Sequence, residues 1–288
     1  MTTPLSPPAP APSGESSIGA LLLEAGKITP EHAERVLRMQ KELGIRFGEA
    51  AMRLGLVNEA DIEQVLARQF DYPYLQGGAG KFSERLVAAY QPFSPQVEAL
   101  RAVRSQLMLR WFARGHKSLV VVGVDRDADA SLFTANLAVV FSQLGEQTLL
   151  VDGNMRQPCQ HDIFNLQGRQ GLSDMLAARA DLDAIARIDS FVDLSVLGAG
   201  TVPPNPQELL ARPLFGELNT RLCQRYDVVL YDAPAYALGS DALALGMRTG
   251  GALVVARKHH SRLDSINALG QQLRSSGVQV VGSVLAEF

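Results

Sequence analysis

Six short runs rich in Val and Leu follow one another after residue 117, and stretches of helical pattern separate most of them. They occupy residues 118–124, 147–152, 193–197, 227–232, 251–256 and 278–285. Short, continuously apolar runs are typical of strands buried on both faces, and helices between them provide the crossovers that parallel strands require. The sequence therefore predicts an α/β domain over residues 96–288, built on a parallel sheet with helices covering both faces.

The loop after the first predicted strand lies where a nucleotide-binding fold places its phosphate loop. The pattern G-x-x-x-x-G-K-[S/T] requires glycine at position 129 and lysine at position 130, whereas this chain has Asp129 and Ala130 and keeps Ser131. Such a loop binds phosphate through backbone N–H groups, a helix N-terminus and the lysine. We therefore predict a P-loop NTPase-like fold with a degenerate nucleotide-binding loop, formed by Arg126, Asp127, Asp129, Ala130 and Ser131.

The carboxylates of this loop are negatively charged and therefore repel phosphate. One carboxylate about 4 Å from a phosphate charge costs about 4 kcal/mol at an effective dielectric constant of 20, which is roughly a thousandfold in affinity. Arg126 is the cation within the loop, and the five lysines lie elsewhere in the chain, at Lys27, Lys41, Lys81, Lys117 and Lys258. The alternative is that residues 125–131 form an ordinary acidic surface loop.

Two of the predicted strands end in a carboxylate. Asp152 follows Leu149-Leu150-Val151, and Asp232 follows Val228-Val229-Leu230-Tyr231. Ligands of parallel sheets bind at the carboxyl ends of the strands, where an aspartate can hold Mg²⁺ beside a phosphate. Ser131, Asp152 and Asp232 are therefore predicted to form a metal site. The alternatives are that Asp152 caps the turn after its strand and that Asp232 only terminates its strand.

An internal repeat precedes the α/β domain. Its matching positions are offset by 29 residues and pair Ile18-Gly19 with Phe47-Gly48, Gly26 with Gly55, and Gln40 with Gln69. Each copy has the pattern of a short helix, a glycine stop and a second helix, and Thr29-Pro30 and Asn58-Glu59 are helix starts. Two such copies can bury their apolar faces together. A small all-α domain is predicted over residues 17–76, after a Pro-rich disordered tail over 1–16 and before a linker over 77–95.

Composition excludes several classes of protein. A net charge of −3 gives no basic footprint for nucleic acid. Cys159 and Cys223 are too few for a disulfide framework or a metal cluster. No run approaches 18 apolar residues, and the first residues lack the basic start and apolar stretch of a signal peptide. These features predict a cytoplasmic protein.

Four further motifs lie within residues 90–288. They are Leu149–Pro158, similar to h-h-h-D-x-D-h-R-x-P; Tyr226–Pro234, a strand that ends in Asp and Pro; Val202–Leu210, which contains P-P-N-P-x-E-L-L; and Glu98–Arg104, which reads E-x-x-R-x-x-R. Together they resemble the bacterial tyrosine autokinases of the exopolysaccharide chain-length determinant family.

The resemblance implies a site, cofactors and partners. It assigns catalytic positions to Asp152, Asn154 and Asp232, with ATP and Mg²⁺ as cofactors. It implies that Glu98, Arg101 and Arg104 lie on the helix through which these kinases form oligomeric rings, although these residues could also be a solvated ion-pair row. It also implies a location at the inner membrane, through the cytoplasmic tail of a polysaccharide co-polymerase. Alternatively, the prolines of residues 203–206 only stiffen the loop before a helix that begins near Gln207.

Three features depart from the family pattern. The phosphate loop is acidic, Asn154 stands where the family has a second acid, and no tyrosine follows Tyr236 where the family carries an acceptor cluster. An amide cannot accept a proton as a carboxylate can. We therefore expect a pseudokinase that regulates exopolysaccharide biosynthesis, chain length and export. The alternatives are an active, divergent tyrosine kinase of the same pathway, with Arg126 acting for the lysine, and a ParA- or MinD-like partitioning ATPase.

The N-terminal repeat is similar to the N-terminal domain of type II secretion and pilus ATPases. Some members of that group bind cyclic di-GMP, so the resemblance implies a cyclic di-GMP site at Arg46, Gly48, Gly55 and Gln69. The first copy has Ser17 where the second has Arg46. A guanidinium can stack on guanine and bind phosphate, so the loss of one arginine weakens the match. The alternative is a docking domain without a ligand.

Overall fold

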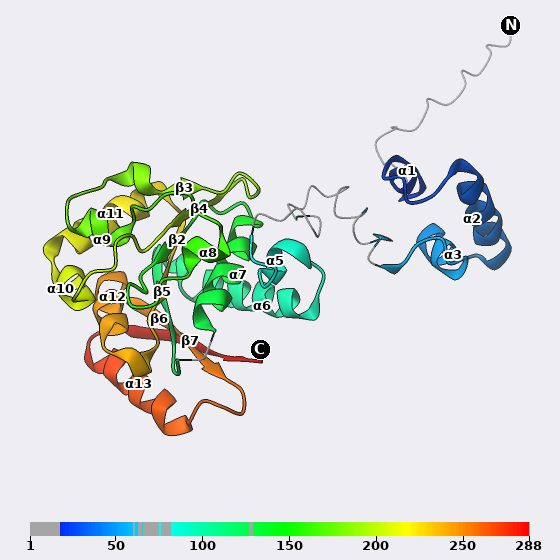
Figure 1. The fold of residues 1–288 in the computed structure, drawn as a ribbon. Helices are drawn as coiled ribbons and strands as arrows, with labels where there is room; N and C mark the ends of the chain where they lie inside the picture. Colours follow the sequence, from blue (N-terminus) through cyan, green and yellow to red (C-terminus); the bar gives the residue numbers. More distant parts are fainter. Residues whose placement is uncertain are drawn as a thin grey trace, which may run out of the picture. The chain divides into compact units, whose positions relative to one another are not determined.

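The computed structural model describes residues 18–59, 61–62, 65, 75, 82–126 and 129–287. The chain divides into two units, residues 1–72 and 73–288 (Figure 1). The predicted tail over residues 1–16 and the predicted site residues Gln69 and Asp127 lie outside the described residues.

The first unit is helical. Its helices include α1 (Ile18–Glu24), α2 (Pro30–Leu43) and α3 (Phe47–Arg53). The hydroxyl of Thr29 accepts a hydrogen bond from the backbone N–H of His32 at 3.3 Å, which caps α2. Asn58 and Asp61 cap the next helical turn reciprocally, because each side chain accepts from the backbone N–H of the other. Both helix starts predicted from sequence therefore act as N-caps.

The repeated glycines explain how the two copies pack together. A Cβ atom on Gly19 would lie 3.0 Å from the ring of Phe47, and one on Gly48 would lie 3.3 Å from Ile62 and 3.7 Å from Ile18. Gly19 thus makes room for Phe47 of the other copy, and Gly48 makes room for Ile62 of its own copy and lies against Ile18 of the other. Gly26 and Gly55 end the first helix of their copies with φ of 67° and 66°, a conformation that favours glycine.

The second unit contains a seven-stranded sheet. Its strands are β1 (Ser118–Gly123), β2 (Thr148–Asp152), β3 (Ala186–Arg187), β4 (Leu194–Leu197), β5 (Val228–Ala233), β6 (Gly251–Arg257) and β7 (Gln279–Ala286). Their order in the sheet is β3-β4-β2-β5-β1-β6-β7, and only β3 pairs antiparallel. Six strands lie within one residue of the predicted ranges, which confirms the predicted α/β architecture. β3 was not predicted, because a strand of two residues is too short to show a pattern.

Helices cover both faces of the sheet (Figure 1). One core contains Leu119 and Val121 of β1 with α5 (Val87–Tyr90), α6 (Pro95–Arg110) and α7 (Ala130–Ser142). The other contains Val120 and Val122 with five further helices: α9 (Leu172–Leu176), α10 (Pro206–Ala211), α11 (Pro213–Arg225), α12 (Asp241–Thr249) and α13 (Leu263–Ser275). Alternate residues of a strand point to opposite faces, so each strand contributes to both cores. The short elements are α8 (Gln160–Ile163), η1 (Phe112–Arg114), η2 (Leu182–Ala184) and η3 (Tyr236–Leu238).

Residues 82–90, which we call the strap, fall within the range 77–95 predicted as a linker. Instead they pack on α7. Leu86 and Ala88 of the strap are fully buried, and the side chain of Asn136 accepts a hydrogen bond from the backbone N–H of Ala88 at 2.8 Å. The strap is thus part of the core of the second unit. Its Leu-Val-Ala-Ala run is only four residues long, too short for the sequence to separate a helix from a linker.

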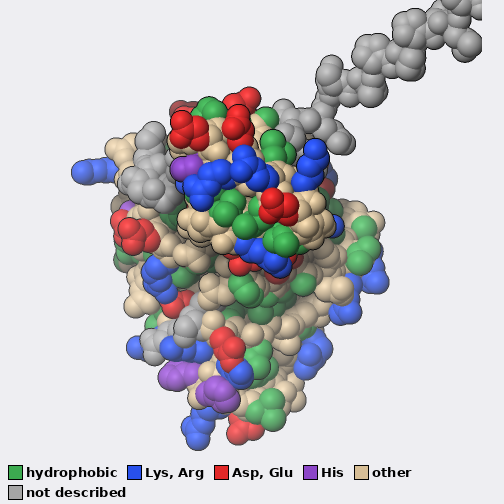
Figure 2. Space-filling view, turned by 90° about the vertical axis from the view of Figure 1, so that its right-hand side faces the viewer, with side chains coloured by type: hydrophobic (Ala, Val, Ile, Leu, Met, Phe, Trp, Pro, Cys, Tyr) green, Lys and Arg blue, Asp and Glu red, His purple; other side chains and the backbone are tan. Residues whose placement is uncertain are grey.

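The surface shown in Figure 2 is mixed in character. Lys, Arg, Asp and Glu side chains are interspersed there with apolar ones. Among the described residues, no helix combines the length and the apolar character needed to cross a membrane.

Candidate functional site

Asp152 and Asp232 are neighbours at the carboxyl edge of the sheet. β2 pairs with β5, and the two aspartates are partners in the register. Both are fully buried. The topology therefore brings together the two strand-end carboxylates that the sequence singled out.

Asp152 stabilises the turn that follows its strand. Its carboxylate accepts hydrogen bonds from the backbone N–H groups of Asn154 at 3.1 Å, Cys159 at 3.1 Å and Gln160 at 3.0 Å. This is the capping role that the sequence analysis left open. Because the same carboxylate also faces Asp232, capping does not exclude a role in the site.

Asp232 is only partly satisfied. The side-chain amide of Gln160 donates to Asp232 Oδ2 and to the carbonyl of Ser131, both at 2.9 Å. Asp232 Oδ1 is buried and has no hydrogen-bond partner among the described residues. Burial raises the pKa of Asp232, although the nearby side chains of Gln160 and Ser131 oppose that shift. Burial and the nearby charge of Asp232 raise the pKa of Asp152.

These groups fit a magnesium ion. Mg²⁺ binds hard oxygen donors, and proteins often hold it through one or two carboxylates while water and phosphate complete its shell. Ser131, Asp152 and the unpartnered oxygen of Asp232 provide such donors. Within the described residues, no group of three or more His, Cys, Asp or Glu could hold a metal. A cation here would therefore depend on two carboxylates, and binding it would release protons from them.

The phosphate loop places a carboxylate where the pattern requires glycine. Asp129 precedes α7 with φ of 40°, in the left-handed region, which Asp tolerates better than most residues. Its carboxylate does not cap α7. Instead it accepts from Arg85 Nη2 at 2.6 Å. Asp125 accepts a hydrogen bond from the hydroxyl of Ser261.

A cavity of about 440 Å³ lies at this loop. The described residues that line it include Ser131 and Asn154, and its charged lining consists of Arg85, Arg126, Asp125, Asp129 and Asp162. No lysine is among these lining residues. The described lining therefore combines two arginines with three aspartates.

Comparison with known proteins identifies the family. Tyrosine-protein kinase wzc of Salmonella typhi is 32% identical to this chain over 201 residues, which is 70% of this chain and 28% of that protein. A putative tyrosine-protein kinase in the cps region of Klebsiella pneumoniae is 29% identical over 265 residues, 92% of this chain and 34% of that protein. The chain thus spans about a third or less of the length of these relatives. No family model matches it.

Solved structures agree. The crystal structure of the chimerical protein CapA2B2 matches with a TM-score of 0.66 at 34% identity, over 77% of this chain and 97% of that chain. The kinase domain of the Escherichia coli tyrosine kinase ETK matches with a TM-score of 0.67 at 30% identity, over 70% and 79%. This chain belongs to the bacterial tyrosine kinase family. The septum site-determining protein MinD of Pyrococcus horikoshii, solved with Mg-ADP, matches less closely, with a TM-score of 0.51 at 26% identity over 59% of this chain and 69% of that chain. These likenesses confirm the predicted P-loop NTPase-like fold.

Asn154 is engaged in local structure within this tyrosine kinase fold. Its side-chain oxygen accepts a hydrogen bond from the backbone N–H of Gln157 at 3.1 Å. Two residues on, Arg156 forms a two-pronged ion pair with the buried Asp241 of α12. The turn after β2 is therefore fixed at both ends, and Asn154 lines the cavity as an amide.

The predicted oligomerisation residues lie on α6. Arg101 pairs with Glu98 one turn earlier. Arg104 Nη1 donates to the carbonyl of Val140 at 2.7 Å and thereby holds α6 against α7. Glu98 and Arg101 thus form the predicted ion-pair row, whereas Arg104 has a packing role. Their part in oligomer formation stays a prediction.

The residues predicted to bind cyclic di-GMP have different structural roles. Gly48 is buried against Ile62, Gly55 adopts a left-handed turn, and Arg46 is exposed at the start of α3. The two glycines therefore have packing and turn functions of their own. A ligand at Arg46 stays a prediction.

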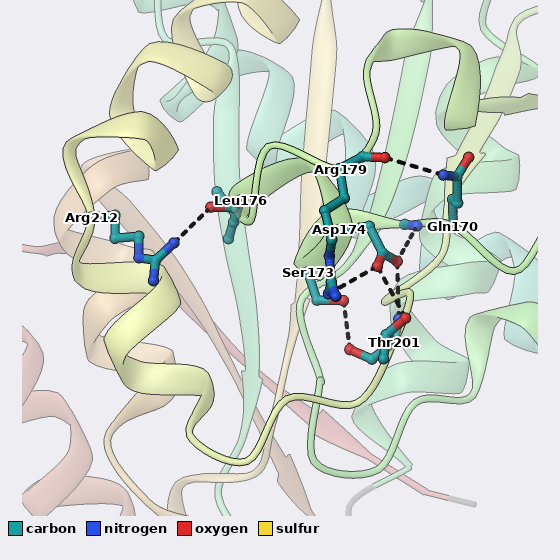
Figure 3. Close-up of polar contacts among 8 residues, drawn as sticks. Gln170, Ser173, Asp174, Leu176, Arg179, Thr201 and Arg212 are labelled. Atoms are coloured by element: carbon teal, nitrogen blue, oxygen red, sulfur yellow. Dashed lines mark hydrogen bonds and ion pairs between the residues drawn. The ribbon is translucent and has the colours of Figure 1, made fainter.

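Hydrogen bonds to Asp174 hold the start of the loop that contains Pro203 and Pro204 (Figure 3). Its first residue, Thr201, donates from its backbone N–H and its hydroxyl to Asp174, each at 3.0 Å. Asp174 of α9 also accepts from the backbone N–H of Gly171 at 3.2 Å and pairs with Arg179 at 3.2 Å. Burial opposes the charge on Asp174, but these donors outweigh it and lower the pKa of its carboxyl.

Two residues of the site, Arg85 and Gln160, were not predicted from the sequence. Arg85 lies in the strap and enters the loop only through tertiary packing. Gln160 lies two residues after the motif that ends at Pro158, and nothing in a lone glutamine indicates that it bridges Asp232 and Ser131. The sequence signal that could have pointed to Arg85 is its place directly before the apolar run of residues 86–89 in the predicted linker.

Proposed function

We propose that this chain is a pseudokinase of the tyrosine kinase family, which regulates exopolysaccharide biosynthesis, chain length and export. The observation that supports it most directly is the phosphate loop. Asp129 occupies the left-handed glycine position, and Ala130 stands at the lysine position where α7 begins. Phosphoryl transfer depends on positioning and charge stabilisation, so a loop that repels phosphate removes the main source of catalysis.

Asn154 supports the same proposal. Its side-chain oxygen already accepts a backbone hydrogen bond. As an amide it cannot take the proton of an attacking hydroxyl, as a carboxylate general base can. The site would therefore lack its catalytic base even if a nucleotide were bound.

We infer the partner and location from the family. Relatives include a putative tyrosine-protein kinase in a cps region. We propose that the chain is peripheral at the inner membrane, bound to the cytoplasmic tail of a polysaccharide co-polymerase. We also propose that the chain forms a homo-oligomer through α6, the helix that carries Glu98, Arg101 and Arg104.

Calorimetric titration with Mg–ATP and Mg–ADP tests the proposal. The wild type is expected to show no binding at micromolar nucleotide, because the carboxylate at position 129 costs about a thousandfold. The double variant Asp129→Gly/Ala130→Lys restores the glycine and the lysine that precede Ser131 in the pattern, although Val124 still stands at the first glycine position, and it serves as the positive control. Micromolar binding of Mg–ATP by the wild type would contradict the proposal.

A second candidate function is an active, divergent tyrosine kinase. Two observations favour it. The relatives include tyrosine-protein kinases. Ser131, Asp152 and Asp232 are also all present, and one oxygen of Asp232 has no partner among the described residues. The similar MinD protein was solved in complex with Mg-ADP, which supports ATP and Mg²⁺ as the cofactors of this fold. Radiolabel from γ-labelled ATP that appears on the wild type and is lost in Asp232→Ala would establish this candidate. Absence of label in both removes it.

A further inference from the structure

Arg85 brings a second cation to the phosphate loop, beside Arg126 of the loop itself. Its Nη2 atom lies 2.6 Å from Asp129 Oδ2. Both side chains line the cavity at the loop. Arg85 is distant from the loop in sequence, so no loop motif reveals it.

The backbone of Arg85 is held at the cavity from two sides. On α7, Asn136 donates to the carbonyl of Arg85 at 3.4 Å and accepts from the N–H of Ala88 at 2.8 Å. On α8, the carbonyl of Ile163 accepts from the N–H of Ser83 at 2.9 Å. Ser83 and Ile163 also line the cavity. The guanidinium therefore projects from a fixed backbone toward the place where a phosphate would lie.

We propose that Arg85 is the phosphate-binding cation of this site and that Asp129 blocks it by forming an ion pair with it. The proposal rests on the proposed function, in which the loop holds nucleotide poorly, and names the contact responsible. A guanidinium presents a planar fork of N–H donors that matches phosphate oxygens. Asp129 already accepts from one nitrogen of that fork, Nη2, so a phosphate must compete with a carboxylate that is part of the chain.

The exposure of the pair makes such competition feasible. The side chains of Arg85 and Asp129 are 60% and 39% exposed. Ion pairs this exposed contribute little to stability. Removing the carboxylate should therefore leave the fold intact and release the guanidinium for a polyphosphate.

A double-mutant cycle tests the proposal on the full chain. Asp129→Asn, Arg85→Ala and the double variant are titrated by calorimetry with Mg–ATP and, separately, with tripolyphosphate, which reports phosphate contacts without a base. Asp129→Asn should bind both ligands at least about tenfold more tightly than the wild type, since it removes one repulsive charge. The double variant should lose at least about tenfold of that affinity, as expected for a lost charged hydrogen bond.

Two further variants separate this role from general charge. Arg221 pairs with Asp181 at 3.0 Å and is similarly exposed, so Arg221→Ala in the Asp129→Asn background is the matched control and should change nothing. Arg85→Lys in that background should keep part of the affinity. Thermal unfolding checks that each variant is folded.

The outcomes separate the two proposals. If Asp129→Asn binds neither ligand, or binds equally well with and without Arg85, the role of Arg85 is wrong. If the wild type itself binds Mg–ATP at micromolar concentration, the pseudokinase proposal fails. In that case Arg85→Ala in the wild type must weaken binding at least about tenfold, or the role of Arg85 fails as well.

Discussion

Asp174 and Asp232 are both buried carboxylates of the same unit, and their surroundings are opposite. Asp174 accepts from two backbone N–H groups and a hydroxyl and pairs with an arginine (Figure 3). Asp232 keeps one oxygen without a partner among the described residues and faces a second carboxylate. The pKa of Asp174 is lowered and that of Asp232 is raised.

The difference teaches how to separate a structural acid from a candidate ligand-binding acid. A buried carboxylate with every lone pair satisfied stabilises the fold as an anion. A buried carboxylate without such donors destabilises the fold unless it is protonated or bound to a cation. Groups with strongly shifted pKa values are concentrated at functional sites. Asp174 therefore belongs to the scaffold, and Asp232 to the candidate site.

The largest expected effect concerns Gly171, which donates its N–H to Asp174. A Cβ atom on Gly171 would lie 2.1 Å from the carbonyl oxygen of Gly198. Because backbone must shift to admit it, Gly171→Ala should lower the free energy of unfolding by about 4 kcal/mol. Urea denaturation measures it. Gly168→Ala, where a Cβ would meet nothing within 4 Å, is the control, and equal losses in both variants would contradict the packing argument.

Removing the carboxylate of Asp174 is expected to lower the free energy of unfolding slightly less than Gly171→Ala does. Asp174→Ala leaves the N–H groups of Gly171 and Thr201 without acceptors, so unfolding at pH 7 should become about 3 kcal/mol easier. Because the folded pKa is lowered, the stabilisation is present above the unfolded pKa of about 3.9 and is lost as pH falls through the folded value. The gap between variant and wild type should therefore narrow in acid.

The exposed Asp181 provides the comparison for that measurement. Its side chain is 69% exposed and pairs with Arg221. Asp181→Ala should leave the free energy of unfolding close to that of the wild type, because ion pairs this exposed contribute little. If Asp174→Ala were no worse than this variant, the hydrogen bonds of Asp174 would not stabilise the fold.

Neutralising the carboxylate of Asp232 should raise the free energy of unfolding rather than lower it. Asp232→Asn removes a buried charge, and its amide can still accept from Gln160. Chemical denaturation at pH 8 should show a gain of about 2 kcal/mol, in line with the raised pKa. Asp162→Asn, a change at an acid whose side chain is 82% exposed, should show no gain. A loss of stability in Asp232→Asn would mean that a further donor satisfies the charged carboxylate.

The wild type should also show a pH slope. Since the folded pKa values of Asp152 and Asp232 are raised, the folded state binds more protons than the unfolded state above about pH 4. Stability should therefore fall as pH rises from about 5 to 8, by at most about 1.4 kcal/mol per unit for each proton. Denaturation at several pH values measures the slope, and Asp232→Asn should flatten it. A wild-type slope of zero would contradict the raised pKa values.

Much of the fold was predictable because its signals are local. The six apolar runs set the strands to within one residue, and the glycines at offset 29 set the repeat. β3 and the strap were not predictable, because short segments acquire their structure from their neighbours rather than from their own pattern. Part of the site was predictable in the same way, since an acid at the end of a buried strand points to the carboxyl edge of the sheet.

The sequence by itself determined that Asp152 and Asp232 end strands. It predicted that Asp129 and Ala130 stand at glycine and lysine positions, and the family resemblance implied that Asn154 stands at the position of an acid. Only the tertiary structure decided that β2 lies beside β5, that Gln160 bridges Asp232 to Ser131, and that Arg85 reaches Asp129. The physical reason is range: strand patterning and turn chemistry depend on neighbours in the chain, whereas the pairing of charges depends on which distant segments the packed core brings within a few ångströms.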